Sequence, residues 1–299
     1  MAGDKSAVPV SNELENTAHP VIGNGREVRH PGPKVSWESV VAWLNRCFAF
    51  TYRNFLIATR NFFSFAELIF WPIVSLISIG LLGKFVQLED KALAFILTGA
   101  ITAGILQVTQ LDVAYSLLYE VWSKSLKHTY LTPVGNSENL FGSWIIGIMR
   151  GSIIFIILGL SAIGLFGFSF PPIVTTLVFF SGVFLSALLL GMLVSLLILT
   201  FGQKAEITAW MLSYVLMLIC GIYYPINILP RFFYYVAQFI PLTYFLDYFR
   251  RGFGFSPVLE HGLLKGFGLI GAYLWMGLLL MRISFRQARK KGILVRLSE

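Results

Sequence analysis

Six long apolar stretches recur along this chain, and they restrict its fold more than any other feature. They lie near residues 68–86, 92–111, 140–166, 172–201, 206–224 and 262–283. Each holds at least ~17 mostly apolar residues, enough for a helix to cross the ~30 Å hydrocarbon core of a bilayer. Backbone groups in lipid must pair within the chain, and none of the stretches alternates like a barrel strand. We therefore expect an all-α membrane protein with six transmembrane helices.

The composition favours a membrane protein over a nucleic-acid-binding one. Of 299 residues, 56% are hydrophobic and only 13% are charged, whereas soluble domains carry roughly 25% charged residues. The net charge of +8 fits basic residues that mark the cytoplasmic ends of spans, so no nucleic-acid partner is expected. Cys47 and Cys220 lack CxxC spacing and the four histidines are scattered, which predicts neither a disulfide framework nor a metal site.

The composition divides the chain into four segments. Residues 1–34 are polar and punctuated by Pro and Gly, which predicts a disordered cytoplasmic tail because little apolar surface can be buried. Residues 35–65 have helical periodicity, residues 66–285 contain the six spans, and residues 286–299 form a basic cytoplasmic tail.

The 35–65 segment predicts an amphipathic helix that connects the tail to the first span. Arg46, Arg53 and Arg60 fall seven residues apart, on one stripe of a helix. An apolar face opposite such a stripe is typical of a helix that lies in the headgroup plane, and a span follows at once. The alternative is a soluble amphipathic helix packed on a protein core.

Lysine and arginine residues indicate the orientation in the membrane. They gather before the first span, after the second, fourth and sixth, whereas the connection after the third span has none. Both termini are therefore expected in the cytoplasm, with the chain in the inner (cytoplasmic) membrane. Arg231, Arg250 and Arg251 follow the fifth span and run against this bias. We interpret them as anchors at the external interface.

The connection from Asp112 to Asn139 predicts a helical elbow on the cytoplasmic side. Glu120 and Lys124 are a favourable i, i+4 pair, so the second span is expected to continue into the cytosol. A short helix should then end before Pro133, because the residue before proline avoids helical backbone. Such an elbow can dock in a groove of a partner; the alternative is an ordinary solvated loop.

The connection after the fifth span is apolar and aromatic but broken by Pro225, Pro230 and Pro241. The pieces are too short to span, which predicts two half-membrane helices that re-enter from the external side. Tyrosines in this segment are expected at headgroup level: Tyr223, Tyr224, Tyr234, Tyr235, Tyr244 and Tyr248.

An ordered set of residues in this connection resembles the pattern of ABC-2 type permeases, the transmembrane subunits of one class of ABC exporter. The set comprises Gly221, Tyr224, Pro225, Leu229, Pro230, the run Pro241-Leu242-Thr243-Tyr244, Asp247 and Arg250. The resemblance covers about residues 36–285. It implies a homodimer of permeases on a dimer of nucleotide-binding ATPase subunits, embedded among membrane lipids.

The resemblance also implies that the connecting helix and the 118–133 elbow contact the ATPase. The residues expected to couple the two subunits are Arg46, Arg53, Glu120, Lys124, Lys127, Thr132 and Pro133. Leu126 and Thr132-Pro133 match the family's elbow, whereas Lys124 and Lys127 replace its Gly and Glu.

No phosphate loop occurs in the chain, since the run from Gly80 to Lys84 is too short and lies at a span end. The chain is therefore expected to be a non-catalytic subunit that binds no cofactor itself, with ATP and Mg²⁺ on the partner. The expected function is ATP-driven export of an amphipathic substrate: a drug-like molecule, a lipid or a lipid-linked glycan.

Three alternatives remain: a membrane-embedded transferase, a self-powered secondary carrier, and a structural or receptor-like membrane protein. Asp112 and the other acidic residues are expected at span ends and Arg150 at a depth from which it can snorkel, which disfavours a carrier. Gly147 and Gly151 form a GxxxG pattern that indicates close helix packing.

Overall fold

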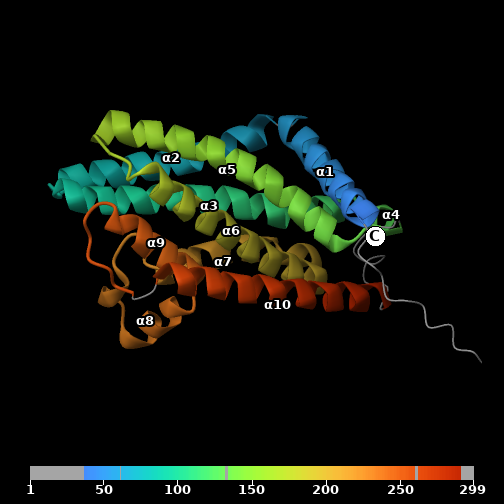
Figure 1. Ribbon diagram of the computed structural model, residues 1–299. Coiled ribbons are helices and arrows are strands. Elements are labelled where there is room, and N and C mark those ends of the chain that lie inside the picture. Colours follow the sequence, from blue (N-terminus) through green and yellow to red (C-terminus); the bar gives the residue numbers. More distant parts are fainter. Residues whose placement is uncertain (1–36, 61, 132–133, 260–261, 291–299) are drawn as a thin grey trace, which may run out of the picture.

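The computed structural model describes residues 37–60, 62–131, 134–259 and 262–290, and these residues form helices and no strand (Figure 1). The predicted 1–34 tail and residues 291–299 lie outside the described residues. The helices are α1 (Trp37–Arg60), α2 (Phe62–Phe85), α3 (Asp90–Trp122), α4 (Leu126–Leu131), α5 (Asn136–Phe166), α6 (Ile173–Phe201), α7 (Glu206–Ile219), α8 (Arg231–Gln238), α9 (Pro241–Arg251) and α10 (Gly262–Lys290). Two short 3₁₀ turns complete the order: η1 (Gly202–Ala205) precedes α7, and η2 (Ile226–Ile228) lies between α7 and α8.

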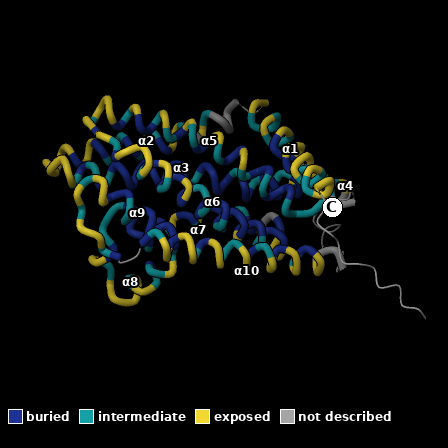
Figure 2. The backbone as a smooth tube through the Cα atoms, viewed as in Figure 1, coloured by how far each residue is buried: buried dark blue, intermediate teal, exposed yellow. Residues whose placement is uncertain are grey.

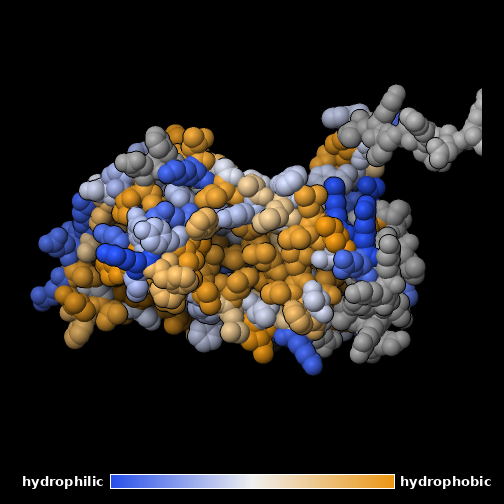
Figure 3. Space-filling view, turned by 90° about the horizontal axis from the view of Figure 1, so that it is seen from below, coloured by the Kyte–Doolittle hydropathy of each residue, from blue (hydrophilic) through white to orange (hydrophobic). Residues whose placement is uncertain are grey.

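Within the described ranges, four helices are long and apolar enough to cross a membrane: α3, α5, α6 and α10. The apolar part of α2 (Ile69–Phe85) and α7 are shorter. Figure 3 shows a broad band of apolar side chains across the middle of one face, with hydrophilic residues gathered toward its two ends. The chain is therefore an all-α integral membrane protein.

Helix α7 is shorter than the span predicted over residues 206–224. It has 14 residues and ends at Ile219, about 21 Å of helix at 1.5 Å per residue. The chain turns there because Gly221 has left-handed backbone (φ 74°) and Pro225 follows, neither of which continues a helix. The last five residues of the predicted span therefore belong to the turn.

Helices α3 and α6 run through the middle of the bundle, whereas α10 exposes much of its surface (Figure 2). Close packing of α5 on α3 confirms the interpretation of the GxxxG pattern. A Cβ atom at Gly147 would lie 3.0 Å from the Thr109 carbonyl oxygen, and one at Gly151 would lie 2.5 Å from Thr109 Oγ1. Thr109 Oγ1 also donates a hydrogen bond to the carbonyl of Gly147 (3.0 Å).

The bundle has two distinct ends (Figure 1). One end holds the start of α1, the helix α4 and the end of α10. The opposite end holds α8, α9 and the turn between α2 and α3. The described helix α10 continues to Lys290, so the first residues of the predicted 286–299 tail are helical.

Helix α1 is amphipathic, as predicted, but its arginine stripe faces the bundle. It ends at Arg60 rather than residue 65, and α2 begins at Phe62. Arg46 and Arg53 contact residues of α5 and α3, whereas several large apolar side chains of α1 are exposed. The exposed set is Trp37, Val41, Leu44, Phe48, Tyr52 and Phe55. Arg46 and Arg53 therefore pair with acidic residues of the protein. The predicted position of α1 in the headgroup plane stays a prediction.

Candidate functional site

A cluster of polar side chains joins α1 to α3 and α5, and we call it the polar node. It consists of Arg46, Arg53, Asn54, Ser116, Glu120, Glu138, Asn139 and Ser143. Arg53 forms an ion pair with Glu120, whose side chain is 2% exposed. Arg46 Nε forms a second ion pair with Glu138 Oε1 at 3.1 Å. Both arginines of the predicted coupling set thus bind acidic residues of their own chain.

The uncharged members of the polar node share the remaining donors and acceptors. Arg53 Nη2 donates to Ser116 Oγ (3.2 Å) and Asn139 Oδ1 (3.4 Å). Asn54 Nδ2 donates to Ser116 Oγ (3.2 Å) and Ser143 Oγ (3.0 Å). Buried polar groups need such partners to offset their desolvation. The node therefore holds three helices in one arrangement.

Glycine lets α1 approach α5 closely beside the node. A Cβ atom at Gly142 would lie 2.5 Å from the Cys47 carbonyl oxygen and 2.7 Å from Phe50 Cβ. Thr51 Oγ1 donates to the Gly142 carbonyl at 3.0 Å. Burial of Cys47, reinforced by the Glu138 charge, raises the pKa of this thiol to about 11.

The elbow departs from prediction at Lys124. The second span does continue as a helix, but α3 ends at Trp122, and Lys124 adopts left-handed backbone (φ 55°). Ser125 N–H donates to the Glu120 carbonyl (3.0 Å) and Lys124 N–H to the Val121 carbonyl (3.2 Å). These two bonds define a Schellman motif, in which glycine normally occupies the left-handed position. Lys124 therefore does not continue the α3 face, and the partner of Glu120 is Arg53 rather than Lys124.

The rest of the elbow contains the short helix α4. Leu126 is fully buried in the core formed by α3, α5, α6 and α10, so the elbow is anchored to the bundle and is not an ordinary solvated loop. The side chain of Lys127 and both Thr132 and Pro133 lie outside the described residues. Their predicted contact with an ATPase stays a prediction.

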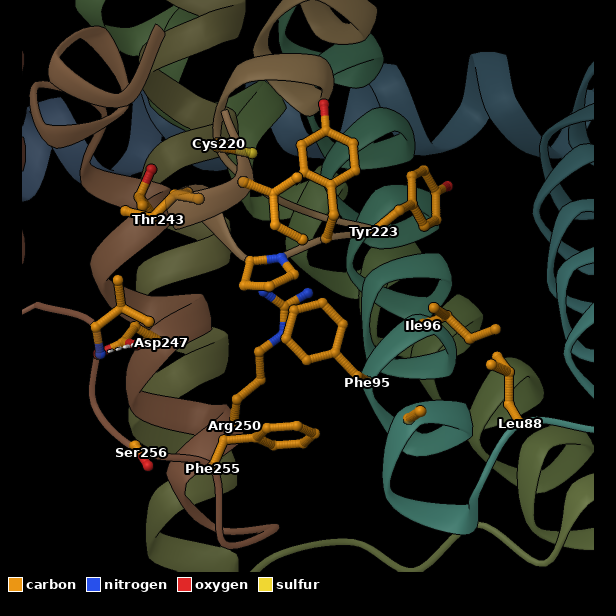
Figure 4. A pocket seen from close by; sticks show the side chains of 16 residues that line it. Leu88, Phe95, Ile96, Cys220, Tyr223, Thr243, Asp247, Arg250, Phe255 and Ser256 are labelled. Atoms are coloured by element: carbon orange, nitrogen blue, oxygen red, sulfur yellow. Dashed lines mark hydrogen bonds between the residues drawn. The ribbon is translucent and has the colours of Figure 1, made fainter. Parts of the chain in front are cut away.

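The residues of the ABC-2 pattern meet around Arg250, which lies in α9. Its Nη1 donates to the Gly221 carbonyl at 2.8 Å, and its Nη2 donates to the Ile222 carbonyl. Its guanidinium lies 3.4 Å from the centre of the Phe95 ring of α3 (Figure 4). The residue is 6% exposed. The interpretation of Arg250 as an interfacial anchor is therefore wrong: it ties α9 to the turn after α7 and to α3.

The other residues of the pattern shape this segment. Pro230 precedes α8 and Pro241 begins α9, as expected for a residue that needs no helical donor. Tyr244 is 5% exposed and donates from its hydroxyl to the Gln238 carbonyl (2.9 Å). Its ring therefore packs inside the protein and not in lipid. Asp247 accepts from the Val258 N–H (3.0 Å) and pairs with Arg251 (2.9 Å).

Further residues of the pattern fix the turns. Tyr224 donates from its hydroxyl to the Leu218 carbonyl. Pro225 immediately precedes η2, and Leu229 immediately follows it. Beside Arg250 lies a largely apolar cavity of about 400 Å³, lined by Tyr224, Pro225, Asp247 and Arg250 together with Phe95, Phe255 and other side chains (Figure 4). The two short helices predicted from the prolines, α8 and α9, are thus present, and α9 contributes Thr243, Asp247 and Arg250 to the lining of this cavity.

A second cavity of about 560 Å³, which we call the aromatic cavity, lies among α2, α3, α5 and α7. Its aromatic lining is Trp71, Tyr115, Tyr119, Trp122 and Trp210. Its ionisable lining is Glu67, Asp112, Arg150 and Glu206. Asp112 and Arg150 form an ion pair with side chains 11% and 14% exposed. Asp112 thus lies within the 33-residue α3 and pairs with Arg150, and its predicted place at the end of the membrane span stays a prediction.

Sequence reasoning missed the residues that complete these sites. Glu138 and Asn139 of the polar node, Phe95 beneath Arg250, and Trp71 and Trp210 of the aromatic cavity each depend on contacts between distant segments. A charged residue in the first turn of α5 was the one local signal for Glu138. Among the described residues no group of three or more His, Cys, Asp or Glu side chains could hold a metal ion.

The fold and these sites define a helical membrane protein whose amphipathic entry helix, elbow and proline-broken helix pair surround a compact bundle. The ABC-2 type transporter family matches residues 45–253. The chain therefore belongs to the ABC-2 type transporter family, and it is a permease subunit of an ABC transporter. Such permeases work with an ATP-binding partner.

One relative is an uncharacterized protein of Archaeoglobus fulgidus. It is 46% identical to the present chain over 61 residues, which are 20% of this chain and 95% of that protein.

Proposed function

We propose that this permease forms the membrane path of an exporter that moves an amphipathic substrate out of the cytoplasm. The observation that carries the proposal is the aromatic cavity, because it offers about 560 Å³ of ring-lined space among α2, α3 and α7. Ligand sites of this kind combine apolar walls with a few polar groups that fix orientation. The cavity would receive cargo from the cytoplasmic half of the membrane.

The proposed assembly is a homodimer of this chain on two ATPase subunits, with ATP and Mg²⁺ bound by the ATPase alone. Support for a lateral partner comes from α7, where exposed apolar residues form one stripe: Ile207, Met211, Tyr214, Val215 and Leu218. A second copy or membrane lipid would cover this stripe. The permease itself would catalyse no reaction.

The proposed orientation places both termini in the cytoplasm of a cell with this chain in its inner membrane. Support comes from the shared end of the bundle at which α1 begins, α4 lies and α10 ends (Figure 1). The ATPase would dock at this end, against α4 and the adjoining part of α1. The segment with α8 and α9 would then face outward as the proposed re-entrant pair, with six crossings in all.

The proposed coupling runs through the polar node. ATP-driven closure of the partner would displace α4, and the Arg53–Glu120 ion pair would carry α1 along with α3. Coupling requires an element whose arrangement both sites bias. Because Glu120 is buried and bound to Arg53, it would transmit the motion and would not touch the ATPase.

Co-purification followed by reconstitution tests the proposal. The full chain, tagged and extracted in mild detergent, should retain a cytosolic subunit that carries a phosphate loop. Proteoliposomes containing both should move substrate only with ATP, and replacing the phosphate-loop lysine of that subunit should abolish the movement. Movement by this chain alone without ATP would contradict the proposal and would identify a self-powered carrier.

A further inference from the structure

The aromatic cavity carries an excess of negative charge. Three carboxylates line it (Glu67, Asp112 and Glu206) against one guanidinium, that of Arg150. The charge of Arg150 is compensated by Asp112, with which it forms an ion pair. In the described part of the chain neither Glu67 nor Glu206 takes part in an ion pair. The two glutamates therefore give the lining of the cavity a negative potential.

Several aromatic rings of the cavity pack against one another. Tyr119 and Trp122 meet edge to face at 5.4 Å, and Tyr115 meets Trp122 at 5.8 Å. Trp210 Nε1 donates to the Tyr115 hydroxyl at 2.9 Å, which fixes the indole beside the phenol. Ring faces attract cations through their quadrupole, and they do so more strongly where water is excluded.

One carboxylate oxygen of the cavity lining has no hydrogen-bond donor among the described residues. Asp112 Oδ1 accepts from Arg150, whereas Asp112 Oδ2 is buried and has no hydrogen-bond partner among the described residues. Buried polar atoms normally find a partner. Asp112, which lines the cavity, thus leaves one carboxylate oxygen without a donor from the described part of the chain, beside the aromatic rings.

We propose that the aromatic cavity binds organic cations with an apolar body, such as quaternary ammonium or phosphonium groups that carry rings or alkyl chains. This assignment names the cargo class and therefore rests on the proposed function for its transport role. Anionic substrates would meet Glu67 and Glu206 without a free counter-charge. Neutral glycans would gain nothing from the carboxylates, whereas a cation uses both the carboxylates and the ring faces.

Two ions of the same shape and opposite charge provide the test. Binding of tetraphenylphosphonium and of tetraphenylborate is measured by equilibrium dialysis with the purified full chain in an uncharged detergent. Wild type should bind the cation at least about tenfold more tightly than the anion, as a cation–π and ionic contribution of about 1.4 kcal/mol implies. Equal binding of the two ions would overturn the proposal.

Matched variants locate the site. The double change Glu67→Gln with Glu206→Gln keeps the side-chain shape and should lower cation affinity about tenfold. Glu206→Lys should shift the preference toward tetraphenylborate. Glu89→Gln and Trp275→Leu alter exposed residues outside the cavity and should leave binding unchanged. Unchanged affinity in the double variant, with an unfolding temperature equal to that of wild type, would place the cation elsewhere and refute the assignment.

The binding test needs no ATPase, so the two proposals fail separately. If the cation binds in the cavity but proteoliposomes with the ATPase do not move it in an ATP-dependent way, the export proposal fails and the binding site stands. If ATP-driven transport occurs and the chain binds both ions equally, the cation assignment alone fails.

Discussion

Arg53 of α1 and Glu120 of α3 lie 67 residues apart in the chain and form the ion pair at the centre of the polar node. The Glu120 side chain is almost completely buried, whereas that of Arg53 is 32% exposed. Solvent screens an ion pair on the Arg53 side, which limits its contribution. The loss of Arg53 would nevertheless leave a buried carboxylate without its counter-charge.

A double-mutant cycle should reveal this dependence. We expect Arg53→Met and Glu120→Leu each to lower the free energy of unfolding by about 1–3 kcal/mol, because each leaves one charge unpaired. The double variant should be less destabilised than the sum, with a coupling free energy of about 1 kcal/mol. Chemical denaturation in detergent measures it, and strictly additive effects would show that the pair does not hold α1.

Arg250 should not tolerate lysine. A lysine ammonium cannot place parallel donors on the Gly221 and Ile222 carbonyls while its charge lies flat on the Phe95 ring. We expect Arg250→Lys to lower the free energy of unfolding by about 2 kcal/mol. The control is Arg231→Lys, at an exposed position, which should change it by less than about 0.5 kcal/mol. Equal effects of the two changes would contradict the packing described for Arg250.

Lys124 should be improved by glycine. Its left-handed backbone (φ 55°) costs a residue with a Cβ atom about 1 kcal/mol that glycine does not pay. Lys124→Gly should therefore raise the unfolding temperature in a thermal melt. Ser123→Gly, one residue earlier at φ −78°, should lower it because glycine adds only flexibility there. A lower melting temperature for Lys124→Gly would mean that the lysine side chain stabilises the elbow by more than its backbone costs.

The native cysteines of the folded chain should react only slowly with thiol-labelling reagents. Cys47 and Cys220 are 2% and 1% exposed. With a pKa of about 11, Cys47 is about 0.1% thiolate at pH 8, and that fraction rises with pH. Maleimide should therefore react slowly with the folded wild-type chain and quickly after denaturation, as a gel-shift assay would show. Rapid labelling of the folded chain would indicate that α1 leaves α5.

Because the native cysteines should react slowly, introduced cysteines can report the membrane topology. Single cysteines are introduced at exposed Val86, in the turn between α2 and α3, and at exposed Lys204, between α6 and α7. On intact cells, an impermeant maleimide should label Val86→Cys, and it should label Lys204→Cys only after the membrane is opened. The reverse pattern would invert the proposed orientation.

The sequence predicted what depends on local pattern. Apolar length located the long helices, and Pro230 and Pro241 located the starts of α8 and α9. The spacing of Arg46 and Arg53 identified one face of α1, but spacing does not say which side meets the bundle. That depended on Glu138 and Glu120, which lie 92 and 67 residues away.

Prediction failed for two residues. Lys124 lies just beyond the end of a helix, and Arg250 is a charged residue that is buried. The pairing of Glu120 with Lys124 assumed one more turn of α3, but the Schellman motif ends that helix at Trp122. Arg250 was expected at the external interface because it follows the fifth span and runs against the bias of basic residues toward the cytoplasm. Its burial depends on two carbonyls exposed by the turn at Gly221 and on an aromatic ring from α3, and no short-range pattern encodes that meeting.

One uninterrupted helix, α3, carries Phe95 beneath Arg250, Asp112 in the aromatic cavity and Glu120 in the polar node. Its 33 residues correspond to about 50 Å of rod. A tilt of about 5° around one end would displace the other by about 4 Å over that length. The helix thus has the geometry of a lever arm, on which a small angular change beside the elbow becomes a displacement as large as a side chain at the far end.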